Sequence, residues 1–118
     1  PLRILPYTKA NPTVQIEKDN SQIKVIIAQK PESTDIVKLT IAPEGQDPKI
    51  IHFETLEGLN RENLSQNTYE NVTINPNSFS EETESYQFSV VYKGNFASAG
   101  TLTISLEDVN GTTHKETF

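Results

Sequence analysis

The sequence predicts an all-β protein, an Ig-like Greek-key β-sandwich of seven to eight antiparallel strands. Large apolar side chains occupy alternate positions of residues 86–92 and again of 102–106, as expected of strands that bury one face and expose the other. Similar runs recur about every ten residues, separated by Asn, Asp, Gly and Pro, which is the spacing typical of sandwiches. A barrel is the main alternative, and the chain shows no βαβ rhythm and no internal repeat.

The expected elements follow one another along a single domain. Residues 1–11 contain Pro1 and Pro6 and are interpreted as a linker or edge segment, which leaves residues 12–118 as one Ig-like domain. Alternating apolar residues predict strands at 14–16, 23–27, 37–41, 51–53, 72–74, 86–92 and 102–106, with a last strand at 112–118.

Several segments depart from this alternation. The pair Asn75-Pro76 is expected to stop the strand before it, and residues 78–84 to form an acidic loop. Residues 56–70 fit neither a clean strand nor a long helix, so we interpret them as a crossover with one short helical turn. Asn110-Gly111 predicts a tight hairpin turn, because both positions favour positive φ.

Composition excludes several classes of function. The 118 residues suit one domain. The net charge is −6 and the Lys residues are scattered singly, so no nucleic acid partner is expected. Cys, Met and Trp are absent, which removes disulfides, thiolate nucleophiles and soft metal ligands. Without an apolar stretch of 18 residues, no membrane insertion of this fragment is expected.

Residue patterns for catalysis are also missing. His52 and His114 fall in strand-like stretches beside charged residues and are interpreted as solvated residues of outward faces. No serine stands in a Gly-x-Ser-x-Gly elbow or has a recognisable base partner. We therefore expect a protein that is not an enzyme and has no cofactor.

Metal binding and cross-linking have weak candidates. Asp19, Asp108 and Asn110 could supply oxygen ligands to Ca²⁺, but Asp and Asn are also the ordinary residues of turns, so no metal site is predicted. Lys24 and Lys38 could form a Lys–Asn isopeptide bond, although no partner Asn stands in the middle of a predicted strand.

Aromatic residues offer the best candidates for a contact surface. Four of them fall in predicted loops and are candidates for ligand or partner contact: Phe96, Tyr69, Phe79 and Tyr7. Phe96, between Gly94 and Gly100, is the first to test. A sugar-binding platform would need two or three such rings on one exposed surface.

The residues that carry a resemblance to known proteins lie at the C-terminal end. They are the strand at 86–92, the run 100–104 and the turn Asp108-Val109-Asn110-Gly111-Thr112. This third of the chain resembles the closing hairpins of Ig-like modules in prokaryotic surface proteins, including CARDB-type adhesion domains. The resemblance implies an extracellular or cell-surface location and assigns no binding residue.

Three functions remain open. The first is a non-catalytic, structural or protein-binding module of a cell-surface or secreted protein, serving as spacer, assembly or adhesion unit. Its partners would be a protein or glycan at the cell surface and neighbouring domains, since a start at Pro1 without Met suggests a piece of a longer chain. The second is an accessory carbohydrate-binding domain of a larger secreted enzyme. The third is a sandwich that recruits short peptides along an exposed sheet edge.

Overall fold

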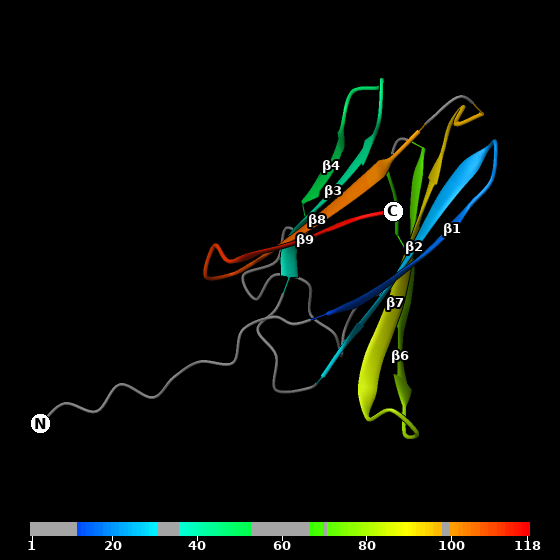
Figure 1. Ribbon diagram of the computed structural model, residues 1–118. Coiled ribbons are helices and arrows are strands. Elements are labelled where there is room, and N and C mark those ends of the chain that lie inside the picture. The colour runs from blue at the N-terminus through cyan, green and yellow to red at the C-terminus, as the bar shows by residue number, and fades with distance from the viewer. Residues whose placement is uncertain (1–11, 31–35, 53–66, 70, 98–99) are drawn as a thin grey trace, which may run out of the picture.

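Two antiparallel β-sheets packed face to face make up the protein in a computed structural model (Figure 1). The structure describes residues 12–30, 36–52, 67–69, 71–97 and 100–118. These residues form strands and turns and contain no helix, so the described part of the chain has no helix that could cross a membrane. The predicted all-β class is confirmed.

Nine strands form the two sheets over the described residues. The five-stranded sheet contains, in spatial order, β1 (Thr13–Lys18), β2 (Gln22–Gln29), β7 (Ser85–Lys93), β6 (Val72–Ser80) and β5 (Asn67–Tyr69). The four-stranded sheet contains β4 (Lys49–His52), β3 (Ile36–Pro43), β8 (Leu102–Asp108) and β9 (Thr113–Thr117).

The strand order is that of an immunoglobulin domain. The order β1-β2-β7-β6 matches strands A, B, E and D, and β3-β8-β9 matches C, F and G. β4 extends the second sheet beside β3, and β5 adds a three-residue strand beside β6. The predicted Ig-like Greek-key sandwich is therefore confirmed, and β5 lies within residues 56–70, which were predicted to be a crossover without a strand.

Alternation of apolar and polar residues places the core between the sheets. On β2, Ile23, Val25 and Ile27 are fully buried, while Lys24 and Ile26 between them are half-buried on the outer face. The other strands add to the same core, which comprises Val14, Ile36, Leu39, Ile41, Ile51, Val72, Ile74, Phe88, Val90, Phe96, Leu102, Ile104 and Leu106. Because the chain has no cysteine, packing of these side chains holds the two sheets together, and ladder hydrogen bonds hold the strands within each sheet.

A β-bulge shifts the inward face at the start of β3. Ile36 pairs with Asp108 and Lys38 with Glu107, so Val37 is the extra residue. Ile36 is fully buried and Val37 is half-buried. The expectation that Val37 begins the buried alternation of this strand is therefore wrong by one residue.

A second irregularity lies within β6. The strand continues through Asn75-Pro76 to Ser80, with a register shift between Asn75 and Ser78. Proline cannot donate to a ladder, and a bulge is one of the places where a strand accepts it. The prediction that Asn75-Pro76 stops the strand is wrong, and the acidic loop shortens to a turn at 81–84.

The sandwich has two ends, which we name after a residue at each. At the Ser85 end, β1 begins, β2 ends and β7 begins, since Thr13 pairs with Ala28 and Ala28 with Gln87. At the Phe96 end, β1 ends, β2 begins and β7 ends, since Gln22 pairs with Lys93. There the amide of Gly94, just after β7, donates to the carbonyl of Ser21 in the β1–β2 turn (3.0 Å).

The last residue of the chain lies at the Phe96 end. There Phe118 exchanges two backbone hydrogen bonds with Leu102 (2.7 and 3.0 Å), at the start of β8. β1 therefore begins at the end of the sandwich opposite to that at which β9 finishes.

Candidate functional site

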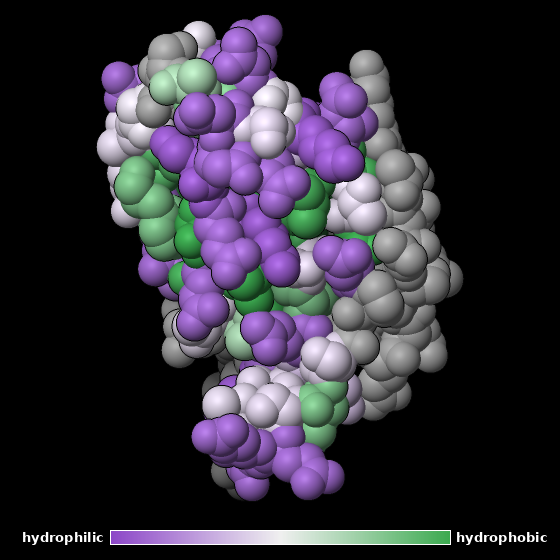
Figure 2. Space-filling model, turned by 90° about the vertical axis from the view of Figure 1, so that its right-hand side faces the viewer, coloured by the Kyte–Doolittle hydropathy of each residue, from purple (hydrophilic) through white to green (hydrophobic). Residues whose placement is uncertain are grey.

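An open pocket lies on the outer face of the five-stranded sheet, at the Ser85 end. Its volume is about 440 Å³, within the range of small-ligand pockets, about 300–1,000 Å³. Figure 2 views the molecule from the side of this sheet and shows hydrophilic residues over most of it, with hydrophobic residues between them. The pocket is lined mainly by side chains that alternate with the buried ones on neighbouring strands.

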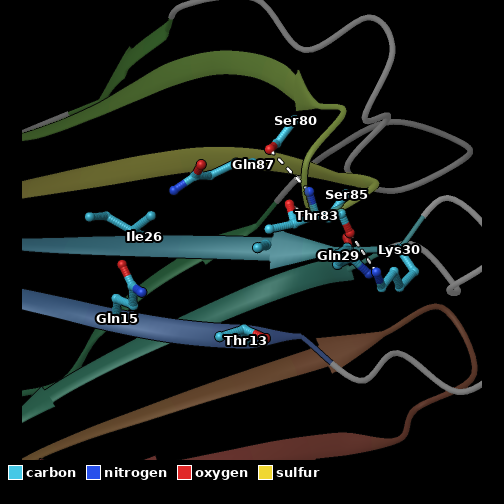
Figure 3. Close-up of a pocket in the computed structure, with 10 residues that line it drawn as sticks. Thr13, Gln15, Ile26, Gln29, Lys30, Ser80, Thr83, Ser85 and Gln87 are labelled. Atoms are coloured by element: carbon cyan, nitrogen blue, oxygen red, sulfur yellow. Dashed lines mark hydrogen bonds between the residues drawn. The ribbon is translucent and has the colours of Figure 1, made fainter.

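The floor and one wall come from β2 and β1. Ile26 and Ala28 of β2 are the apolar residues of the pocket, and Gln15 and Thr13 of β1 pair with them across the ladder. Figure 3 shows Ile26 between Gln15 on one side and Gln87 of β7 on the other. An apolar floor thus lies between two side-chain amides that come from different strands.

The opposite wall is the end of the β6–β7 hairpin. The hydroxyls of Thr83 and Ser85 are 2.7 Å apart, and the Thr83 amide donates to the hydroxyl of Ser80 (3.4 Å). From the end of β2, Lys30 Nζ donates to the carbonyl of Thr83 (2.5 Å), as Figure 3 shows. These contacts tie the hairpin turn to β2 and fix the wall.

The chemistry of the pocket is that of neutral polar groups. Lys30 is the one charged side chain among the described residues that line it, and none of those residues is acidic. The partner of the Ser85 hydroxyl is the Thr83 hydroxyl, which is not a base that could make a serine nucleophilic. This arrangement suits hydrogen bonding to a ligand.

Phe96, the first predicted contact residue, is buried. It is 2% exposed, and its ring packs against that of Tyr92 in an edge-to-face arrangement with centroids 5.3 Å apart. Its amide donates to the carbonyl of Asn20 (2.9 Å), which holds the 94–97 loop against the β1–β2 turn. The expectation that Phe96 is exposed because it lies in a loop is therefore wrong.

Of the other aromatic candidates, Phe79 and Tyr69 lie in strands of the described part of the chain. Phe79 belongs to β6 rather than to a loop, is 48% exposed and packs against Tyr86 with ring centroids 5.0 Å apart. It lies near the tip of the β6–β7 hairpin, which extends past the four-stranded sheet (Figure 1). Tyr69 ends β5 and so is also in a strand, and Tyr7 lies outside the described residues.

Asp19, one of the calcium candidates, caps the β1–β2 turn. Its Oδ1 accepts from the amide of Ser21 (2.8 Å), from the hydroxyl of Ser21 (3.0 Å) and from the amide of Gln22 (2.9 Å). The hydrogen bond from the Ser21 amide is the main cause that lowers the pKa of Asp19 below its ordinary value. The carboxylate thus stabilises the turn.

Asp108 has the same role at the β8–β9 turn. It is buried, and its Oδ1 accepts from the amides of Asn110 and Thr112, both at 2.9 Å. Gly111 has a φ of 82° while Asn110 does not have a positive φ, so the predicted hairpin is confirmed with one left-handed residue instead of two.

The described acidic side chains do not gather into a metal site. Asp19 lies in a turn of the five-stranded sheet at the Phe96 end, and Asp108 lies on the four-stranded sheet opposite Ile36, where β3 begins. No group of three His, Cys, Asp or Glu residues within the described ranges could hold a metal ion.

The histidines and the candidate lysines have assigned environments. His52 is exposed as expected. His114 pairs with buried Leu106 on the core-facing side of β9, where its Nε2 lies 3.0 Å from Glu116 Oε2, so the predicted outward position of His114 is wrong. The two lysines considered for a cross-link form ion pairs, Lys24 with Glu17 at 3.8 Å and Lys38 with Glu107 at 3.1 Å.

Sequence reasoning missed the pocket residues. Two of them, Gln15 and Gln87, are outward residues of predicted strands, and Ser85 is the first residue of β7. Nothing in their local sequence distinguishes them from other polar residues. Their proximity follows from the strand order β1-β2-β7-β6, which local alternation does not reveal.

Comparison with models of protein families, with curated proteins and with solved structures finds no match to this chain.

Proposed function

We propose that the protein is a non-catalytic Ig-like module of a cell-surface or secreted protein, where it serves as a spacer, assembly or adhesion unit. The observation that carries this proposal is the position of the two outer strands, since β1 begins at the Ser85 end and β9 finishes at the Phe96 end. Modules joined through such ends extend along a line, as a spacer requires.

The same geometry suits a module that carries tension. A pull on the start of β1 and on the end of β9 acts along the strands, so it shears β1 against β2 and β9 against β8. Ladder hydrogen bonds run perpendicular to the strands, and in shear they are loaded together instead of one after another. Resistance to pulling is therefore expected without any disulfide.

Single-molecule force spectroscopy tests this proposal. Because the chain has no cysteine, handles can be attached to chosen residues by introducing cysteine pairs. Pulling through the two termini is compared with pulling through Thr103→Cys and Thr117→Cys, which form a pair at the open end of the β8–β9 ladder and whose separation unzips it. We expect a several-fold higher unfolding force when the protein is pulled through its termini than when it is pulled through the cysteine pair. Equal forces would overturn the proposal that the module carries tension.

A second candidate, an accessory carbohydrate-binding domain, is favoured by one observation. The pocket places side-chain amides and hydroxyls around an apolar floor, a combination that suits a polyhydroxylated ligand. The aromatic platform considered above does not support it, because no aromatic residue is among the described residues that line the pocket.

A further inference from the structure

We propose that the pocket at the Ser85 end is a binding site for a short glycan. This inference rests on the carbohydrate-binding role proposed second above and deepens it, because it names a short glycan as the ligand and the residues that would contact it. The force experiment tests the outer strands and the binding experiment tests the pocket, so either one can fail without the other.

The hydrogen-bonding groups of the pocket match those of a sugar. A sugar hydroxyl both donates and accepts, and so do the side-chain amides of Gln15 and Gln87. These amides lie on opposite sides of Ile26 (Figure 3). A sugar ring whose C–H groups rest on Ile26 and Ala28 would present its hydroxyls to both amides.

The wall of the pocket formed by the β6–β7 hairpin is preorganised. The Thr83–Ser85 hydroxyl contact and the Lys30 bond to the Thr83 carbonyl hold the wall in place, so a ligand does not have to order this turn when it binds. The wall is therefore present before the ligand arrives.

The charge of the lining and the pairing of the floor strands disfavour two other classes of ligand. A cation is disfavoured because Lys30 is the charged residue of the described lining, which has no carboxylate. An added peptide strand needs a sheet edge, so it would lie beside β1 and not over the floor of the pocket, where β2 and β7 already pair with neighbours on both sides. Without an aromatic ring for stacking, we expect weak binding, with a Kd on the order of 1 mM, which corresponds to about −4 kcal/mol.

A glycan array followed by titration tests this proposal. The protein is tetramerised on streptavidin to raise its avidity and applied to an array of diverse neutral and acidic oligosaccharides. The monomer is then titrated with the oligosaccharide that is retained most strongly, and amide shifts are followed by NMR. We expect shifts confined to β1, to the end of β2 and to the β6–β7 hairpin.

Matched variants decide whether the pocket is responsible. Gln87→Ala and Gln15→Ala should each weaken binding about fivefold, the loss expected from one hydrogen bond, and Ala28→Arg should fill the floor and abolish it. Gln22→Ala is the control, because Gln22 is on β2 but does not line the pocket and pairs with Lys93 near the Phe96 end.

Three outcomes would overturn the glycan site. The first is that the array retains the parent protein no better than Ala28→Arg. The second is that Gln87→Ala and Gln22→Ala bind the oligosaccharide equally well. The third is that the amide shifts map outside the pocket. Thermal unfolding of each variant establishes that it is folded, and Gln87→Ala changes an exposed side chain, so that variant keeps the test decisive if Ala28→Arg fails to fold.

Discussion

The two ends of the sandwich differ in whether an aromatic ring is buried or exposed. At the Phe96 end, a ring that belongs to a loop is 2% exposed, whereas at the Ser85 end the ring of Phe79, which belongs to a strand, is 48% exposed. The first end is closed by an apolar side chain and by backbone bonds between loops, and the second carries a polar pocket.

This contrast teaches that burial in a sandwich follows the overlap of the sheets rather than the type of element. The loop that carries Phe96 turns back toward the β1–β2 turn and places its ring against Tyr92. The hairpin that carries Phe79 extends past the four-stranded sheet (Figure 1). One end therefore contributes mainly to stability and the other is free to contact a ligand.

Removing the two rings should give the largest difference between the ends. Phe96→Ala should lower the free energy of unfolding by about 3–5 kcal/mol, the usual cost of deleting a buried aromatic ring. Phe79→Ala should lower it by about 1 kcal/mol or less, because that ring is half exposed. Guanidinium unfolding followed by circular dichroism measures both, and equal losses would show that the ends do not differ.

A smaller effect is expected from Gly94→Ala. The added Cβ would lie 2.9 Å from Cζ of Phe96, so the ring or the loop must move, at a cost of about 1–3 kcal/mol. Gly100→Ala should cost less, because its Cβ would meet the carboxylate of Glu44 at 3.1 Å, and a small shift of that exposed side chain relieves the contact.

A double-mutant cycle attributes this loss to the ring. In the Phe96→Ala background, Gly94→Ala should cost much less than it does in the parent protein. An unchanged cost would mean that Phe96 is not the group with which the new Cβ collides.

The smallest expected effect is on the pH dependence of stability. The hydroxyl of Thr101 donates to the carboxylate of Glu44 at the Phe96 end, and this bond is the main cause that lowers the pKa of Glu44. Since the pKa is lower in the folded than in the unfolded state, the stabilisation is present at neutral pH and is lost as the pH falls through the lowered value.

Two substitutions measure this contribution. The loss caused by Glu44→Gln should be greatest near pH 7 and should shrink below about pH 4, near the ordinary pKa of glutamate. Thr101→Val, which removes the donor hydroxyl, should follow the same dependence when denaturation midpoints are compared from pH 7 to pH 2.5. A loss that is constant with pH would contradict the assignment.

Local alternation predicted the strands well because it depends on each strand alone. The buried residues Ile23, Val25 and Ile27 are the ones that alternation identifies. It failed where pairing with a neighbouring strand determines the register. One such place is the bulge that makes Val37 the extra residue, and the other is Asn75-Pro76, where β6 continues through a register shift.

The pocket was beyond prediction for a related reason. Gln15 and Gln87 lie far apart in the sequence, and they approach each other because β2 separates β1 from β7 in the sheet. Contacts within one hairpin can be inferred from its turn, whereas contacts across strands from different hairpins require the topology.

The pairing of the central strands also sets when the protein can fold. Ile23 pairs with Tyr92 and Leu39 with Leu106, so the middle of each sheet joins the first half of the chain to the last third. Long segments must close before these contacts form, and sandwiches of this kind fold in milliseconds to seconds. During synthesis, β2 and β3 therefore wait for β7 and β8, and the four-stranded sheet is complete only when β9 has also been made.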